Sequence, residues 1–198
     1  MDHYFTDNPP KNHDRREIPF RFLGVDLKLL SDHGVFSRNH IDEGSKLLIE
    51  VAHGLGLEGK LLDLGCGYGV IGLTLKKLNS QLEIIGVDIN SNAIDLAMRN
   101  ATLNRIEATF IHQDGMEGLE TFDQILFNPP IRAGKQTIYR LFSETTTHLN
   151  ENGRLLIVMR KQHGAPSAIK YLNELYENVS VLTKSKGYWI IQATGVMS

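Results

Sequence analysis

The sequence predicts an α/β fold built on a mostly parallel seven-stranded sheet with an antiparallel last strand, preceded by an N-terminal β-hairpin. From residue 60 onward, short β-rich runs alternate with amphipathic helical stretches, which is the pattern of parallel strands joined by right-handed crossovers. The last two β-rich runs are separated only by Ser185 and Lys186 before Gly187, which favours an antiparallel pair. With 198 residues and 41% hydrophobic content, the chain is large enough for one α/β core of full size.

The elements follow in order along the chain. Residues 18–23 and 25–30 flank Gly24 and predict the hairpin. A helix is expected to begin near Asp42, where apolar side chains start to recur at helical spacing. The later strands are expected at about 60–64, 82–88, 106–112, 123–127, 153–159, 178–184 and 187–193, with helices at about 69–79, 91–103, 137–149 and 166–177. The sequence contains no repeat, low-complexity segment or long linker, so residues 1–198 are expected to form a single domain.

The composition argues against several classes of protein. The N-terminus is polar, and no apolar run approaches the roughly 20 residues that span a bilayer, so a cytoplasmic protein without a membrane segment is expected. Cys66 is the only cysteine, which excludes an internal disulfide. None of the eight histidines is spaced with other ligand types as in a zinc site, and no metal is expected.

Charge is divided unevenly along the chain. Residues 1–127 carry a net charge of −7, whereas residues 128–186 carry nine Lys and Arg against four Glu, a net charge of +5. For any single lysine, a solvated surface position is the better explanation of the charge. The asymmetry as a whole leaves room for a local anionic partner.

In a sheet of this kind, ligands bind beyond the carboxyl ends of the strands. The first such end reads LDLGCGYG over residues 62–69, and its three glycines let the backbone turn sharply and approach a ligand at the start of a helix. Asp63 stands two residues before the first glycine, and the G-x-G-x-G spacing differs from the G-x-G-x-x-G of dinucleotide enzymes. The structural alternative is a tight turn that binds nothing.

Two further predicted strands end near carboxylates. Asp88 can accept hydrogen bonds from both hydroxyls of a ribose, while Ile89 offers an apolar face to an adenine. Asp114, before Gly115, can accept from the exocyclic amine of that adenine. Alone, Asp88 would also serve as a solvated helix cap and Asp114 as a turn residue. Acidic residues at three successive strand ends instead favour a bound nucleoside.

The fourth strand end reads QILFNPP over residues 124–130. The two prolines after Asn128 exclude both helix and sheet ladder, so they fix the backbone and can hold the Asn128 side-chain oxygen and a nearby main-chain carbonyl toward one point. Two convergent acceptors suit an NH₂ group, whose nitrogen lone pair they would aim at an electrophile. The same tripeptide at Asn8 has no strand before it. A rigid loop without chemistry is the alternative.

These motifs resemble those of class I S-adenosylmethionine-dependent methyltransferases that methylate amines. The chain is also similar to the methyltransferase small domain family, which includes bacterial 16S rRNA guanine-N2 methyltransferases, and in particular to its shorter, single-domain branch. The segments that carry this resemblance are 32–37, 41–45, 63–69, 128–131, 132–135 and 161–166, together with Asp88 and Asp114. The resemblance implies a Rossmann-like fold, in which residues 1–40 form the hairpin and the segment through which the cofactor enters, and residues 41–198 form the core.

The family implies roles for the residues at matching positions. The cofactor would be S-adenosylmethionine, with its methionine part on Asp63 and the glycines, its ribose on Asp88, its adenine on Ile89 and Asp114, and Phe36 closing the pocket. The full set of implied cofactor-binding residues is Phe36, Asp63, Gly65, Cys66, Gly67, Tyr68, Gly69, Asp88, Ile89, Asp114, Gly115 and Asn128. The implied catalytic residues are Asn128, Pro129, Pro130 and Ile131.

The substrate side departs from the family at one position. Ile131 stands where many amino methyltransferases have Tyr or Phe, the ring that stacks on the target base. Base selection is therefore expected to rest partly on another residue, such as Tyr139, Tyr188 or Trp189. The residues expected to contact RNA phosphates follow two strand ends and are Arg132, Lys135, Arg160 and Lys161.

The expected reaction is methyl transfer to an exocyclic amine, with guanine N2 of 16S rRNA as substrate, ribosomal RNA or the small ribosomal subunit as partner, and a monomeric protein. Two alternatives stay open. A protein glutamine-amide N-methyltransferase would use the same asparagine but gains nothing from the basic segment, and a catalytically silent RNA- or cofactor-binding module would use the same surfaces. Cys66 has no evident base partner and is expected to pack as a small side chain.

Overall fold

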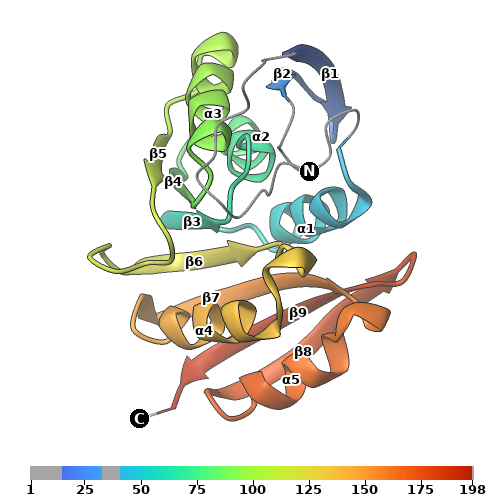
Figure 1. The fold of residues 1–198 in the computed structure, drawn as a ribbon, viewed down its shortest axis with the longest axis vertical. Helices are drawn as coiled ribbons and strands as arrows, with labels where there is room; N and C mark the ends of the chain where they lie inside the picture. Colours follow the sequence, from blue (N-terminus) through green and yellow to red (C-terminus); the bar gives the residue numbers. More distant parts are fainter. Residues whose placement is uncertain (1–14, 33–40, 198) are drawn as a thin grey trace.

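A seven-stranded sheet in the order β5-β4-β3-β6-β7-β9-β8 forms the centre of the molecule (Figure 1). The computed structural model describes residues 15–32 and 41–197. Strands β3 to β7 are parallel, and β9 runs antiparallel to both β7 and β8. The strands of this sheet are β3 (Lys60–Leu64), β4 (Glu83–Asp88), β5 (Thr109–His112), β6 (Phe122–Phe127), β7 (Leu149–Arg160), β8 (Tyr176–Ser185) and β9 (Tyr188–Val196). The predicted mostly parallel sheet with an antiparallel last strand is confirmed.

Helices cover both faces of the sheet, and the strands alternate their side chains between the two. Leu61, Leu126 and Leu156 belong to the core shared with α1, α2 and α3, whereas their neighbours Leu62 and Ile125 point into the core beneath α4 and α5. The helices are α1 (Glu43–Gly54), α2 (Val70–Leu78), α3 (Ser91–Asn104), α4 (Lys135–Thr145) and α5 (Ala165–Leu172). Within the described part of the chain, none of these helices is long and apolar enough to cross a membrane.

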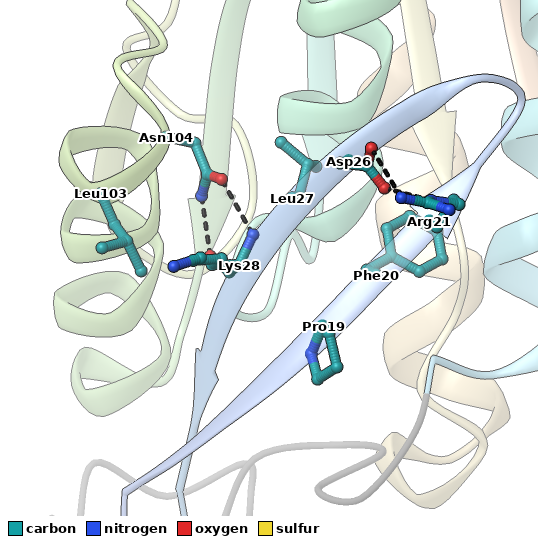
Figure 2. Close-up of a pocket in the computed structure, with 8 residues that line it drawn as sticks. All are labelled: Pro19, Phe20, Arg21, Asp26, Leu27, Lys28, Leu103 and Asn104. Carbon is teal, nitrogen blue, oxygen red and sulfur yellow. Dashed lines mark hydrogen bonds and ion pairs between the residues drawn. The ribbon is translucent and has the colours of Figure 1, made fainter.

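The N-terminal hairpin forms a separate two-stranded sheet, β1 (Arg16–Phe22) with β2 (Val25–Ser31), as predicted. Two asparagines of α3 hold its second strand. The Asn104 amide accepts from the Lys28 N–H at 2.9 Å and donates to the Lys28 carbonyl at 2.8 Å (Figure 2), and Asn100 makes the same pair of bonds with Leu30. The Asn100 amide also donates to the Tyr68 carbonyl at 2.9 Å, so α3 ties the hairpin to the glycine loop.

Figure 2 shows an open pocket between this hairpin and α3. Its volume is about 500 Å³, and it contains none of the residues predicted to bind cofactor or RNA. The lining residues are Pro19, Phe20, Arg21, Asp26, Leu27, Lys28, Leu103 and Asn104. The carboxyl ends of the strands, where ligands are expected, lie elsewhere.

The element boundaries differ from the sequence prediction mainly after residue 130. The helix expected over 137–149 occupies Lys135–Thr145, and two short 3-10 helices that were not predicted, η1 (Ile131–Ala133) and η2 (Lys161–His163), follow β6 and β7. Three consecutive threonines at 145, 146 and 147 each donate a hydroxyl hydrogen bond to the carbonyl three residues earlier, at 2.6, 2.7 and 3.1 Å. Such side-chain bonds compete with helix continuation, so α4 ends there.

Candidate active site

The sheet brings the predicted strand-end residues to one edge. Leu64, the last residue of β3, pairs with Val87 of β4 on one side and with Phe127 of β6 on the other. The glycine loop that follows Leu64 therefore lies between Asp88 and Asn128, which come directly after these partners. The strand register alone places the predicted cofactor and catalytic residues side by side.

The glycine loop has the backbone geometry expected from its sequence. Gly65, Gly67 and Gly69 have φ angles of 67°, 56° and 89°, the left-handed region that side chains other than glycine rarely adopt. At Gly69 a Cβ atom would also lie 3.1 Å from the Leu73 side chain. Cys66 within the loop is buried, and burial raises the pKa of its thiol well above the ordinary value. A neutral, buried thiol agrees with a packing role for Cys66 and not with a nucleophile.

Asp63 is a buried carboxylate with one oxygen unsatisfied. Its side chain is 1% exposed, and Oδ2 accepts from the Gly72 N–H at 3.0 Å. Oδ1 is buried without a hydrogen-bond partner among the described residues. Burial is the largest influence on the Asp63 carboxyl and, with a smaller contribution from Asp88 and against the Gly72 hydrogen bond, raises its pKa to about 7. A cationic donor would both satisfy Oδ1 and favour the ionised form, so Asp63 fits the amino group of an amino-acid ligand.

Asp88 is held by the backbone on both sides. It is 3% exposed, and its Oδ2 accepts from the Gly67 N–H at 2.8 Å while Oδ1 accepts from the Asn90 N–H at 2.9 Å. The cap of α3 is Asn90, whose side chain accepts from the Ala93 N–H at 3.1 Å, so Asp88 is not the solvated helix cap that was its structural alternative. Each carboxylate oxygen can accept more than one hydrogen bond, so this fixed carboxylate also suits ribose hydroxyls.

Asp114 lies at the surface in an ion-paired cluster. Its Oδ1 accepts from Arg140 of α4 at 2.6 Å, and Arg140 also pairs with Glu144. Glu144 in turn accepts from the Met116 N–H at 3.0 Å. This cluster orients the Asp114 carboxylate and leaves Oδ2 as the acceptor for the predicted adenine contact. Gly115 has a φ of 77°, and a Cβ there would collide with Glu144, so only glycine fits this turn.

Asn128 comes directly after β6 and lies against the first turn of α1. Its amide nitrogen donates to the Ser45 Oγ at 3.0 Å and to the Asp42 Oδ1 at 3.4 Å. Within the described part of the chain, no hydrogen bond reaches the amide oxygen of Asn128. Pro129 is buried and Pro130 is the N-cap of η1, so two prolines with restricted φ angles follow Asn128 directly.

Residues 26–192 match the sequence profile of the family described as methyltransferase small domain. The chain belongs to this family. It is 41% identical, over 98% of its length and 99% of the relative's, to the uncharacterised protein YbxB of Bacillus subtilis. It is 34% identical to ribosomal RNA small subunit methyltransferase C of Hamiltonella defensa, over 88% of this chain and 52% of that protein.

A solved structure has the same fold. The Thermus thermophilus enzyme described as 16S rRNA N2 G1207 methyltransferase (RsmC), in complex with AdoMet and guanosine, superposes with a TM-score of 0.84 at 26% identity. The match covers 94% of this chain and 52% of that one. The chain thus spans about half the length of the named rRNA methyltransferases to which it is similar. Because the methyltransferase small domain family uses S-adenosylmethionine, the predicted family and cofactor are both confirmed.

Ile131 cannot stack on a target base as an aromatic ring would, and each of the three aromatic residues suggested in its place already packs against another side chain. Ile131 itself is 53% exposed on η1. Tyr139 stacks on Tyr171 with ring centroids 4.4 Å apart. Tyr188 lies with the Arg160 guanidinium 4.4 Å from its ring centroid, and Trp189 has the Lys184 ammonium at 4.1 Å. The Arg160 guanidinium over the Tyr188 ring is a planar cation at the end of β7, and bases also stack on guanidinium planes.

The four predicted RNA-contacting residues share the carboxyl edge of the sheet. Arg132, Lys135 and Lys161 are exposed, and Arg160 is half-buried. Lys184 and Lys186, which were not among the predicted residues, lie at the same edge in the region of the β8–β9 turn. This follows from the β7–β9 register, in which the first residue of β9, Tyr188, pairs with Arg160 at the end of β7. We call the six residues the basic rim.

Phe36, which was predicted to close the cofactor pocket, lies outside the described residues, as does Asn8 of the other Asn-Pro-Pro tripeptide. Ile89 is half-buried beside Asp88, and its carbonyl is 2.9 Å from the His112 Nε2. The sequence predicted Asp42 as the start of a helix and included Ser45 in a segment of the family resemblance, but it indicated no contact of either residue with Asn128. In the described part of the chain no three His, Cys, Asp or Glu side chains gather as metal ligands.

Proposed function

We propose that this protein transfers the methyl group of S-adenosylmethionine to the N2 amine of a guanine in 16S rRNA, in the cytoplasm. The observation that carries the proposal is Asn128, a fixed amide at a strand end beside the glycine loop. Its nitrogen donates hydrogen bonds to Ser45 and Asp42, and its oxygen accepts none from the residues that the structure describes. Such an oxygen is an acceptor held ready for an amine.

The cofactor half of the site is supported by the buried carboxylates. Asp63 would accept from the amino group of the cofactor through its unsatisfied Oδ1, and Asp88 would accept from the ribose hydroxyls. Asp114, oriented by Arg140, would accept from the adenine amine. When bound, S-adenosylmethionine supplies a methyl group on a positively charged sulfur.

Asn128 would act on the target amine. Its oxygen and a main-chain carbonyl of the Asn-Pro-Pro loop would accept hydrogen bonds from the two N–H groups of the amine. These bonds would turn the nitrogen lone pair toward the methyl carbon. The new N–C bond forms as the C–S bond breaks, the electron pair stays on sulfur as a thioether, and the nitrogen releases one proton to solvent. Because the amine nitrogen gains positive charge during transfer, the hydrogen bond from its N–H to the Asn128 oxygen becomes stronger in the transition state.

Ribosomal RNA as substrate is supported by the basic rim and by the relatives. The basic rim places positively charged side chains at the edge of the sheet where Asn128 lies. Contacts between such side chains and phosphates position a nucleic acid on a protein. The names of the relatives refer to small-subunit rRNA, and that of the solved relative to a guanine N2. The exposed Ile131 offers apolar contact to a base but no aromatic stacking, so the basic rim would carry more of the recognition.

The test is methylation with labelled cofactor of 30S subunits, free 16S rRNA, DNA and a release-factor protein, followed by mass spectrometry of digested products. We expect N2-methylguanosine from one of the two ribosomal substrates, and formation of the same product about 10²–10³-fold more slowly with Asn128→Ala. Label only in protein, on a glutamine amide, would replace the proposal with its alternative. No labelled product from any substrate, together with measurable RNA binding, would favour a binding module.

A further inference from the structure

The amide of Asn128 is held by a hydrogen-bond network that begins at the first turn of α1. Asp42 is the N-cap of that helix, and its Oδ1 accepts from the Ser45 N–H at 3.0 Å. Its Oδ2 accepts from the Ser45 hydroxyl at 2.6 Å. Asn128, 86 positions away in sequence, completes the network by donating to both Asp42 and Ser45.

Donor and acceptor chemistry allows only one direction for this network. A carboxylate is an acceptor only, so the Ser45 hydroxyl must give its single proton to Asp42. The hydroxyl oxygen then has lone pairs for one N–H of Asn128, and Asp42 accepts the other. Because both contacts require donors, the amide nitrogen of Asn128 faces α1 and its oxygen must face the opposite way.

The network lies on a closely packed support. Ser45 is 4% exposed. Between the two residues, Gly44 has so little room that a Cβ atom would lie 2.9 Å from both the Asp42 Oδ1 and the Tyr188 ring. The first turn of α1 is therefore packed against β9 and cannot shift toward it. A ligand-contacting amide is fixed most accurately when its own partners are fixed in this way.

We propose that Asp42 and Ser45 are positioning residues for methyl transfer: they hold the Asn128 amide with its oxygen toward the target amine. The inference rests on the proposed function of Asn128. The capping of α1 requires neither the Ser45 hydroxyl nor the contact with Asn128, because the cap is complete with the Asp42 side chain and the Ser45 backbone N–H. The Asp42 charge also polarises the amide through its N–H groups, which increases the negative charge on the oxygen that grips the amine.

The main variant is Ser45→Ala, which removes the hydroxyl but keeps the backbone cap. We expect its kcat to fall about tenfold or more, because a misoriented amide spends little time in the productive geometry, while RNA KM and cofactor affinity change little. Asp42→Asn keeps an acceptor at the Oδ1 position but puts an NH₂ group where Oδ2 accepts from the Ser45 hydroxyl, which disturbs the hydroxyl that binds Asn128, so its kcat should also fall. Lys46→Ala is the matched control, since it breaks the partly exposed Glu43–Lys46 pair of the same helical turn and leaves the contacts of Asp42, Ser45 and Asn128 in place.

A double-mutant cycle separates positioning from general damage. If Ser45 acts through Asn128, then Ser45→Ala in an Asn128→Ala background should cost no further turnover. A kcat of Ser45→Ala within about twofold of the wild type, or losses that simply multiply in the double variant, would overturn the inference.

A readout independent of activity separates this inference from the proposed function. The side-chain ¹⁵N amide signal of Asn128, assigned by its absence in Asn128→Ala, should shift in Ser45→Ala and stay in place in Lys46→Ala. A signal unchanged in Ser45→Ala would contradict the contact itself. If Asn128→Ala methylates RNA at the wild-type rate, the proposed role of Asn128 fails instead, whatever the signal shows.

Discussion

The two halves of the strand-end site are built differently. On the cofactor half, Asp63 and Asp88 are 1% and 3% exposed and accept hydrogen bonds from backbone N–H groups of α2 and of the glycine loop. On the substrate half, Ile131 is 53% exposed, and half of the basic rim lies on 3-10 helices or in the β8–β9 turn, namely Arg132, Lys161 and Lys186. A small, constant ligand suits a site preformed from the core. A large, charged ligand can be recognised by a surface that is shaped on binding. Asn128 lies where the two halves meet.

The largest expected effect is at that meeting point. Asn128→Ala should bind cofactor nearly normally and RNA only slightly less well, yet lose about 10²–10³-fold in turnover, as for removal of one preorganised hydrogen-bonding group. Single-turnover methyl transfer at saturating cofactor and RNA measures this directly. Asn8→Ala, in the other Asn-Pro-Pro tripeptide, is the matched control and should keep its activity. A near-wild-type rate for Asn128→Ala would mean that the asparagine is structural only.

Asn128→Asp sharpens the same comparison. The substitution keeps an acceptor toward the amine, but it removes both donors to α1 and places a second carboxylate against Asp42. It also stabilises the cationic cofactor before transfer, which opposes the reaction. We expect strong impairment, partly relieved in the exchanged pair Asp42→Asn with Asn128→Asp, which again leaves a single carboxylate between the two positions. Equal activity of the single and exchanged variants would argue against coupling between positions 42 and 128.

The cofactor half should respond in affinity and not in the chemical step. Asp63→Ala and Asp88→Ala each remove a charged acceptor, which costs about 1.5–3 kcal/mol, or about ten- to a hundredfold in Kd for S-adenosylmethionine. Isothermal titration calorimetry on variants with native circular dichroism measures the loss. Unchanged affinity in both folded variants would remove these residues from the site.

The same division decides what could be predicted from the sequence. The sheet, the glycine loop and the acidic strand ends were predictable because hydrophobic periodicity and strand polarity are local signals. The end of α4 was not, since it depends on the hydroxyl bonds of three threonines. The role of Asp42 was not either: its capping pattern is local, but its contact with Asn128 joins residues 86 positions apart and exists only once the sheet has formed.

The pH dependence of cofactor affinity should be moderate. Because burial raises the Asp63 pKa to about 7, the carboxylate that a cationic amino group needs becomes protonated below that pH. Affinity should therefore fall up to about tenfold from pH 8 to pH 6, the change in ionised fraction for a pKa near 7. Asp63→Asn should bind more weakly and lose this dependence, measured by calorimetry in buffers of equal ionic strength. An equally steep profile in Asp63→Asn would assign the titration to another group.

The stability of the ligand-free protein should change in the opposite sense. A carboxyl whose folded-state pKa is raised stabilises the fold when protonated, and this contribution is lost as pH rises through about 7. Asp63→Asn, which cannot ionise, should therefore gain stability relative to the wild type between pH 6 and pH 8. Thermal unfolding without cofactor gives the difference. A constant difference in Tm across this range would show that Asp63 titrates as an ordinary exposed carboxyl.

The smallest effects are expected from single residues of the basic rim. Arg132 and Lys161 are exposed on η1 and η2, so each is expected to contact at most one or two phosphates. Releasing one phosphate contact lowers the slope of log affinity against log salt by about 0.7–0.9, which corresponds to about threefold in affinity for each fourfold change in salt. Arg132→Glu and Lys161→Glu should accordingly raise the RNA KM a few fold at low salt, flatten its salt dependence, and leave cofactor affinity unchanged.

Lys77→Glu, a charge reversal at another exposed lysine near the end of α2, is the control for net charge. If Lys77→Glu flattened the salt dependence as much as the rim variants, the effect would belong to overall charge, and the rim would be ordinary solvated surface. If the rim variants flattened the salt dependence of the RNA KM and Lys77→Glu did not, the RNA backbone would lie along the edge of the sheet next to Asn128. This edge is the exposed half of the site, which the folded core does not preform.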